Sequence, residues 1–119
     1  MYSPRIITYD FGSVTASAGG TSNPSTRHPI VGELVKIVID DINTAATGSI
    51  FVQSNPFGNM YLTHGSVINT ASNQEIYFSA NQQGTGGDTD AYPVVSDVII
   101  LSGVGFGNGS SYIARLYYR

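Results

Sequence analysis

The sequence of 119 residues contains no cysteine and no tryptophan, and only 11% of its residues are charged. Without cysteine, no disulfide can staple the fold, so stability has to come from burial of apolar side chains. A chain of this length can bury such a core as one domain, and 41% of its residues are hydrophobic. The charged share is about half of the roughly 25% that is typical of soluble domains.

The polar part of the chain consists mainly of Ser, Thr, Asn, Gln and Gly. These residues lose their water against a partner more cheaply than Lys or Glu do. The composition therefore favours a surface that packs against other chains. A monomeric extracellular β-domain is the alternative, because many such domains share this composition.

The charge and hydropathy patterns argue against nucleic-acid and membrane partners. The basic residues are scattered, so no basic stripe is present to neutralise phosphates; they are Arg5, Arg27, Lys36, Arg115 and Arg119. No apolar run approaches the roughly 18–20 residues that span a bilayer. The first residues lack the charged-then-apolar pattern of a signal peptide, so we expect the chain to fold in a cytoplasm.

Side chains suited to catalysis are scarce. The only histidines are His28 and His64, and no Gly-x-Ser-x-Gly sequence marks a nucleophile. Serine is plentiful, so counting alone leaves a Ser–His–acid site open, but small all-β domains rarely host that chemistry. We therefore expect a protein that is not an enzyme and that holds no cofactor.

Two clusters of oxygen-bearing side chains are of the kind that calcium accepts. One joins Asp40 and Asp41 to Asn43, and the other places Asp88 and Asp90 in a glycine-rich stretch. Neither has the twelve-residue spacing of an EF-hand, and a pair of aspartates in a polar loop is more often solvated. We expect no bound metal, with Asp88 and Asp90 as the better calcium candidates.

Short stretches of alternating apolar and polar residues recur along the whole chain, and no helix of ordinary length is evident. The expected strands cover residues 4–11, 13–17, 33–42 and 49–53, a stretch marked by Met60 and Leu62, and residues 66–68, 75–80, 94–101 and 112–118. We therefore predict an all-β fold. It is a single antiparallel β-sandwich or jelly-roll-like barrel of about eight short strands, with residues 1–119 in one domain.

Two strands are expected to be central. In the strongest one, residues 33–42, the alternation predicts that Val35, Ile37 and Ile39 share one face and that Lys36 and Asp40 share the other. The other strand, residues 94–101, is apolar on both faces. We expect Val38 and Ile100 to be buried in these strands, so that an aspartate at either position would unfold the domain.

The segments expected to reach a partner are a possible N-terminal arm, residues 1–5, and two long loops, residues 18–29 and 81–90. These loops are too long for tight hairpins, and loops of this length often contact a partner. Arg27 and His28 lie in the first loop, and Gly86 and Gly87 lie in the second. We expect these four residues to contribute to a partner surface.

Aromatic side chains are the other candidates for contact. Four of them are predicted to point away from the inward-facing sets of their strands: Phe51, Tyr61, Tyr77 and Tyr117. Exposed rings on a sheet face bind protein partners or stack on sugars. The alternative is that both sheet faces are covered and these rings belong to the core.

Over its whole length the chain resembles the small β-rich virion proteins of tailed bacteriophages and related viruses, above all head-decoration (cement) and minor capsid proteins. The resemblance is carried by the leaderless start, the absence of Cys and Trp, the Ser/Thr/Asn/Gly composition and the ending 111–119, SYIARLYYR. It implies a β-sandwich or β-barrel that stabilises the shell of a virion through contacts with the major capsid protein or other virion subunits. Such proteins are often homo-oligomers, for example trimers. No functional residue is carried over, because the group has no fixed site motif.

Two other functions compete with this one. The first is a carbohydrate-binding or adhesive β-domain of fibre or lectin type, which predicts an exposed row of Tyr and Phe beside polar side chains. The second is a self-assembling subunit of a tail, fibre or filament. A stable oligomer without affinity for sugars favours the structural functions, and a monomer that binds a glycan favours the adhesive one.

Overall fold

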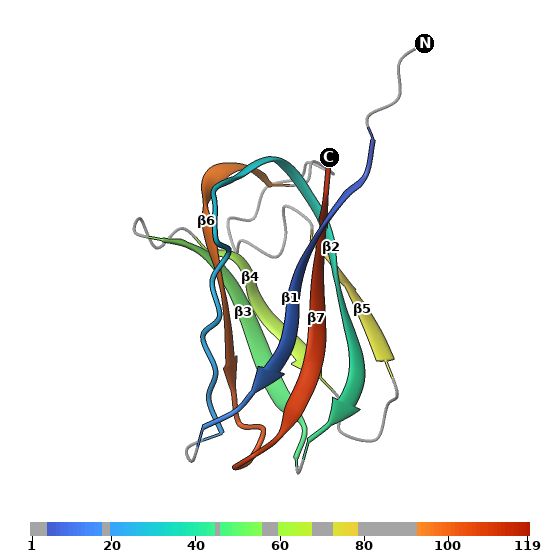
Figure 1. Ribbon diagram of the computed structural model, residues 1–119, viewed down its shortest axis with the longest axis vertical. Helices are drawn as coiled ribbons and strands as arrows, with labels where there is room; N and C mark the ends of the chain where they lie inside the picture. Colours follow the sequence, from blue (N-terminus) through green and yellow to red (C-terminus); the bar gives the residue numbers. More distant parts are fainter. Residues whose placement is uncertain (1–4, 18–19, 45, 56–59, 68–72, 79–92) are drawn as a thin grey trace.

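The computed structural model of the chain describes residues 5–17, 20–44, 46–55, 60–67, 73–78 and 93–119. Every regular element in these ranges is a β-strand and none is a helix, so the predicted all-β class is confirmed. The strands are β1 (Ile7–Thr15), β2 (Ile30–Asn43), β3 (Gly48–Asn55), β4 (Met60–Val67), β5 (Asn73–Tyr77), β6 (Val94–Val104) and β7 (Ser111–Tyr118) (Figure 1). No helix in the described part of the chain is long and apolar enough to cross a membrane.

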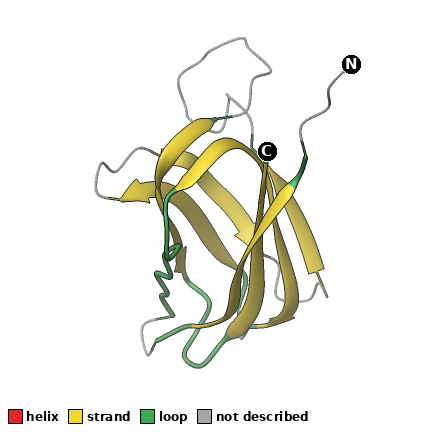
Figure 2. Ribbon diagram, turned by 45° about the horizontal axis from the view of Figure 1, so that its top comes forward, coloured by secondary structure: helices red, strands yellow, loops and turns green. Residues whose placement is uncertain are grey.

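All strand pairs are antiparallel. Six strands are joined in the order β1-β7-β2-β6-β3-β4, and β5 pairs with β2. β2 connects two halves of the sheet, because its first residues, 30–33, pair with β6 and its later residues pair with β7 and β5. The sheet bends there, so that its two halves lie across from each other (Figure 1 and Figure 2). Within the described residues β1 and β4, the strands at the two ends of the order, do not pair, so the sheet is not closed.

An extended segment between β1 and β2 lies along an edge of β6. Ser22 and Ser25 form isolated bridges with Gly103 and Ile100. Ser22 and Gly103 also exchange both backbone hydrogen bonds, at 3.0 and 2.8 Å. The range 18–29, predicted to be a loop, therefore contains a stretch that is paired with the sheet.

β1 is one strand where the sequence predicted two. Its pairing with β7 is irregular between Asp10 and Gly12, which marks a β-bulge. Gly12 has a φ of 76°, a left-handed conformation that glycine adopts without a steric penalty. The bulge kinks the strand without ending it, so the two predicted strands are continuous.

The residues that share the buried face of β2 differ from the predicted set. Leu34, Ile37 and Ile39 are fully buried, whereas Val35 is only half-buried. The pairing of β2 with β7 is irregular between Leu34 and Lys36. A bulge adds one residue to a strand and so shifts which residues face inward. The prediction that Val35 shares a face with Ile37 and Ile39 is therefore wrong, and Leu34 takes that place.

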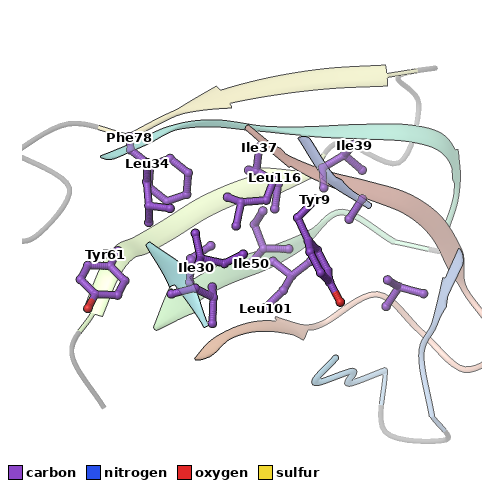
Figure 3. Packing of buried hydrophobic residues seen from close by; sticks show 14 of the residues in the cluster. Tyr9, Ile30, Leu34, Ile37, Ile39, Ile50, Tyr61, Phe78, Leu101 and Leu116 are labelled. Carbon is purple, nitrogen blue, oxygen red and sulfur yellow. The ribbon is translucent and has the colours of Figure 1, made fainter. Parts of the chain in front are cut away.

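The hydrophobic core fills the space between the two halves of the sheet (Figure 3). Leu34, Ile37 and Leu116 come from the half with β2 and β7, and they point toward Ile50 and Leu101 of the half with β3 and β6. All five side chains are fully buried. The two halves are held together by these apolar contacts where no ladder of backbone hydrogen bonds joins them.

Val38 and Ile100 are half-buried, and the prediction that they belong to the core is wrong. Both occupy outward-facing positions, because their neighbours in sequence, such as Ile37 and Leu101, are the buried ones. Their strands carry apolar side chains on both faces, so the sequence alone did not separate the inner face from the outer one.

Phe106 follows β6 and fills a niche that two glycines leave open. Its side chain is fully buried, and its ring centroid lies 5.3 Å from that of Tyr112. A Cβ atom on Gly103 would lie 2.8 Å from Cε2 of Phe106, and one on Gly48 would lie 2.5 Å from its Cδ1. Both distances are too short for carbon atoms, so this ring requires glycine on both sides.

Candidate functional site

A pocket of about 400 Å³ lies at the open edge of β1. We call it the seam pocket, because it lies between β1 and the segment that runs along β6. From β1 it is lined by Tyr9, Asp10 and Phe11, and from the segment by Pro24, Ser25 and Arg27. The bulge in β1 lies within the first of these two walls.

Tyr9 of β1 connects the two walls of the seam pocket. Its side chain is buried, and its hydroxyl accepts a hydrogen bond from the backbone N–H of Arg27 at 2.9 Å. Its ring packs edge-on against Phe11 and His28, with centroid distances of 5.2 and 5.4 Å. The buried hydroxyl of Thr26 donates to the carbonyl oxygen of His28 at 2.7 Å and accepts from the backbone of β6 at 3.1 Å. Both walls are thereby fixed to the body of the protein.

The two charged side chains at the seam pocket have opposite signs. Oδ1 of Asp10 accepts the backbone N–H of Gly12 at 2.7 Å, and Oδ2 lies 3.8 Å from Nε of Arg115. Arg27 is exposed, and its guanidinium forms no ion pair with any acid in the described part of the chain. The pocket thus combines a positioned acceptor, an accessible donor and the half-buried ring of Phe11.

A second group of residues lies on the outer face of β5, β2 and β7. Lys36 pairs with Tyr77 on one side and Tyr117 on the other, and its ammonium lies 5.5 and 5.2 Å from their ring centroids. The same ammonium forms an ion pair with Glu75, and this hydrogen bond raises the pKa of Lys36 above 10.5. Two of the predicted aromatic residues are thus brought together around one cation, which occupies the space between them.

Both arginines on this half of the sheet are paired with acids as well. Nη1 of Arg115 lies 2.6 Å from Oδ2 of Asp40, and Nε of Arg119 lies 2.6 Å from Oε1 of Glu33. Asp40, one of the residues in the first predicted oxygen cluster, is therefore engaged by an arginine. Exposed ion pairs of this kind add little to stability, but they leave the face with few unmatched charges.

The outer face of β3 and β6 has a different character. Phe51 pairs with Ser102, and Gln53 pairs with Ile100. The described side chains that face outward there carry no charge, and Phe51 is half-buried among them. This third predicted aromatic residue therefore lies on the opposite half of the sheet from Tyr77 and Tyr117.

Four exposed apolar side chains come from β1, β2 and β6, or from the residue before β1, at the end of the molecule that carries the C-terminus (Figure 1). They are Ile6, Ile7, Val31 and Val94, which are 46%, 44%, 67% and 77% exposed. Ile7 pairs with the last residue of β7 and Val94 pairs with Glu33, which exchanges both backbone hydrogen bonds with Arg119 at 2.7 and 3.0 Å. We call this group the apolar end.

The predicted outward position of Tyr61 is wrong. Its side chain is 8% exposed, and its hydroxyl donates to Oδ2 of Asp97 at 2.9 Å. The pairing of β3 with β4 is irregular around Val52, which shifts the alternation in this region. Tyr61 therefore belongs to the core and is withdrawn from the partner-binding candidates.

The other predicted residues are spread over the molecule. Arg27 lines the seam pocket, and His28 packs at its edge against Tyr9. Four predicted residues lie outside the described residues: Gly86, Gly87, Asp88 and Asp90. Sequence reasoning did not single out Phe11 or the apolar end. The glycine that follows Phe11 inside a strand pattern was the one available signal, because such a glycine often marks a bulge.

Comparison with known proteins adds no relative from which function could be transferred. No family model matches the chain, and neither a curated protein nor a solved structure matches it. In the described ranges, no group of three or more His, Asp or Glu side chains could hold a metal ion. Function must therefore be inferred from the geometry of the seam pocket and of the apolar end.

Proposed function

We propose that this chain is a viral structural protein, a capsid-decorating (cement) or minor capsid subunit. It would stabilise a shell as a homo-oligomer, through contacts with the major capsid protein or with other virion subunits. The observation that carries the proposal is the apolar end. Val31 and Val94 are the most exposed of the large hydrophobic side chains that the structure describes, and they lie close to each other in the β2–β6 pairing.

Exposed apolar side chains that gather at one place favour contact with another protein, because their burial against a partner is the main driving force of association. The apolar end also suits a dense array of subunits. The neighbouring charges of Glu33 and Arg119 are already paired with each other, so a partner could cover them without leaving either one unmatched.

The arrangement of the strands supports the same function. With the segment at Ser22 and Ser25 counted as a strand, the strands of the described residues form two groups of four: β5-β2-β7-β1, and the segment with β6, β3 and β4. We propose that this is the order of a jelly-roll sandwich, which recurs in viral capsid and lectin domains. A fold shared by both classes does not decide between them, so the apolar end remains the deciding feature.

Oligomeric state tests the proposal directly. We expect the purified chain to form a closed oligomer, such as a trimer, by light scattering coupled to size-exclusion chromatography. Val31→Asp and Val94→Asp should convert it to a monomer while keeping the melting temperature of the isolated subunit, because both side chains are exposed. Val104→Asp is the matched control, since Val104 is also exposed (40%) but lies at the opposite end of β6.

Two outcomes would contradict the proposal. One is a wild-type chain that stays monomeric at the highest soluble concentration, and the other is a Val104→Asp variant that dissociates as readily as Val94→Asp. Mass spectrometry of purified virus particles gives an independent measurement. The chain should be present there at a fixed ratio to the major capsid protein.

A tail, fibre or filament subunit is the closest competitor, because the apolar end would serve it equally well. The two differ in symmetry: a decorating subunit closes into a ring, whereas a filament subunit adds copies without limit. Electron microscopy of the purified chain distinguishes rings from fibres. The adhesive alternative predicts an exposed row of Tyr and Phe beside polar side chains, and Tyr77 and Tyr117 lie on either side of Lys36.

A further inference from the structure

We propose that the seam pocket binds a neutral saccharide of one or two sugar rings. This site is separate from the apolar end and does not depend on the shell-stabilising role. Its volume of about 400 Å³ falls within the range of roughly 300–1,000 Å³ that small-molecule sites occupy. The groups that line the pocket, and the contacts that hold them, match this class of ligand.

The lining supplies what a polyhydroxylated ring requires. The half-buried ring of Phe11 offers an apolar surface on which the C–H face of a sugar can pack. The carboxylate of Asp10 accepts hydrogen bonds from hydroxyls, and the guanidinium of Arg27 donates them. The hydroxyl of Ser25 can do either. An aromatic surface with a few convergent polar groups is the usual composition of such a site.

The two charges at the pocket give no net preference for one sign of ligand. Asp10 and Arg27 line the same pocket with opposite signs, so an anion or a cation is attracted by one side chain and repelled by the other. A phosphorylated ligand such as a nucleotide meets the same repulsion from Asp10, in a chain whose net charge is already −3. A neutral ligand rich in hydroxyls satisfies both side chains at once.

Part of the pocket lining, the carboxylate of Asp10 and the backbone of Arg27, is held in place before a ligand arrives. Asp10 is fixed by the backbone N–H of Gly12 and lies near Arg115, and these contacts leave lone pairs of its carboxylate for a ligand. The backbone of Arg27 is fixed by the hydroxyl of Tyr9. Beside them, a Cβ atom on Gly12 would meet nothing within 4 Å, so the bulge leaves open space there. Groups that are already ordered lose less entropy on binding.

Saturation-transfer difference NMR on the full chain tests the proposal. The probes are the methyl glycosides of glucose, galactose, mannose and N-acetylglucosamine, with glucuronic acid and AMP as charged comparators. We expect at least one neutral glycoside to bind with a Kd of about 1 mM, as a shallow site and a small ligand imply. Both charged comparators should bind more weakly than that glycoside.

Two variants locate the binding. Arg27→Ala removes the donor, and Phe11→Leu keeps an apolar side chain but removes the flat ring; each should raise Kd at least tenfold. The matched control is Asn23→Ala, because Asn23 is exposed on the same segment and does not line the pocket. Its Kd should stay within twofold of wild type. Thermal melting confirms that all three variants are folded.

Three results would overturn the proposal. The first is no saturation transfer to any neutral glycoside at a concentration 20-fold above the expected Kd. The others are an unchanged Kd in both pocket variants, or tighter binding of a charged comparator. Val94→Asp separates sugar binding from the shell-stabilising role. It should lose the oligomer and keep the sugar, so either proposal can fail while the other stands.

Discussion

Replacing Gly103 by alanine should destabilise the protein through one ring, that of Phe106. The new methyl group would lie 2.8 Å from Cε2 of Phe106, 2.9 Å from Oγ of Ser22 and 3.0 Å from the hydroxyl oxygen of Tyr112. All three atoms belong to side chains, so the backbone need not move. Overpacking a close-packed interior by one methyl group costs about 1–3 kcal/mol, and we expect about 2 kcal/mol here.

A double-mutant cycle assigns this cost to the ring. Phe106→Leu shortens the side chain that the methyl group meets and should itself destabilise by about 1.5 kcal/mol or slightly more. In that background Gly103→Ala should cost at least about 1 kcal/mol less than in the wild type, which is a typical coupling energy for residues in contact. The control cycle combines Gly103→Ala with Phe11→Leu. These sites share no partner, so their effects should add within about 0.5 kcal/mol.

Urea unfolding followed by tyrosine fluorescence and circular dichroism supplies all the free energies. The chain contains no tryptophan, and its eight tyrosines provide the fluorescence signal. Equal m-values across the variants would show that the midpoints report stability alone. Additivity in the Gly103–Phe106 cycle, or a Gly103→Ala variant as stable as the wild type, would refute the niche described for Phe106.

Two further predictions concern burial. Leu101→Asp should lower the free energy of unfolding by more than about 4 kcal/mol, because Leu101 is fully buried, whereas Ile100→Asp on the outer face should cost less than about 2 kcal/mol. Equal losses in urea unfolding would show that the inner and outer faces of β6 are wrongly assigned. The second prediction concerns Tyr112, whose pKa burial raises above 10.0, although its hydrogen bond with Ser22 opposes the shift. A raised pKa in the folded state means that stability is present below pH 10 and is lost as the pH rises through the folded value. Melting temperatures between pH 9 and 11.5 should therefore fall more steeply for the wild type than for Tyr112→Phe, and parallel curves would contradict this.

The alternation of apolar and polar residues predicts the regular strands correctly. In β7, Tyr112, Ala114, Leu116 and Tyr118 are buried, and no bulge interrupts the alternation between them. In β2 the alternation fails at Leu34, because a bulge depends on how a strand pairs with its neighbour and leaves no local mark in a run of apolar residues. Strand existence was therefore predictable, and the inward face of an irregular strand was not.

The candidate sites depended on contacts that the sequence does not reveal. Arg27 was predicted to contact a partner from its place in a long loop, but the opposite wall of the pocket that it lines comes from β1. Tyr61 looked outward in a local pattern, yet its hydroxyl partner Asp97 is 36 positions away. Val94 appeared to be the start of a buried strand, and it is 77% exposed because its side chain lies on the face opposite the buried Val95. Each of these depends on tertiary pairing.

The place of β7 between β1 and β2 has a consequence for synthesis. β7 is translated after every other strand that the structure describes, yet it occupies the interior of one half of the sheet. Until β7 has left the ribosome, β1 and β2 lack the strand that joins them. The strand edges that β7 would cover are then open to pairing with other nascent chains on the same messenger RNA. This half of the protein is therefore completed last, through contacts between distant parts of the chain, which fold slowly. A polypeptide interrupted before Ser111 would lack a central strand rather than a dispensable edge.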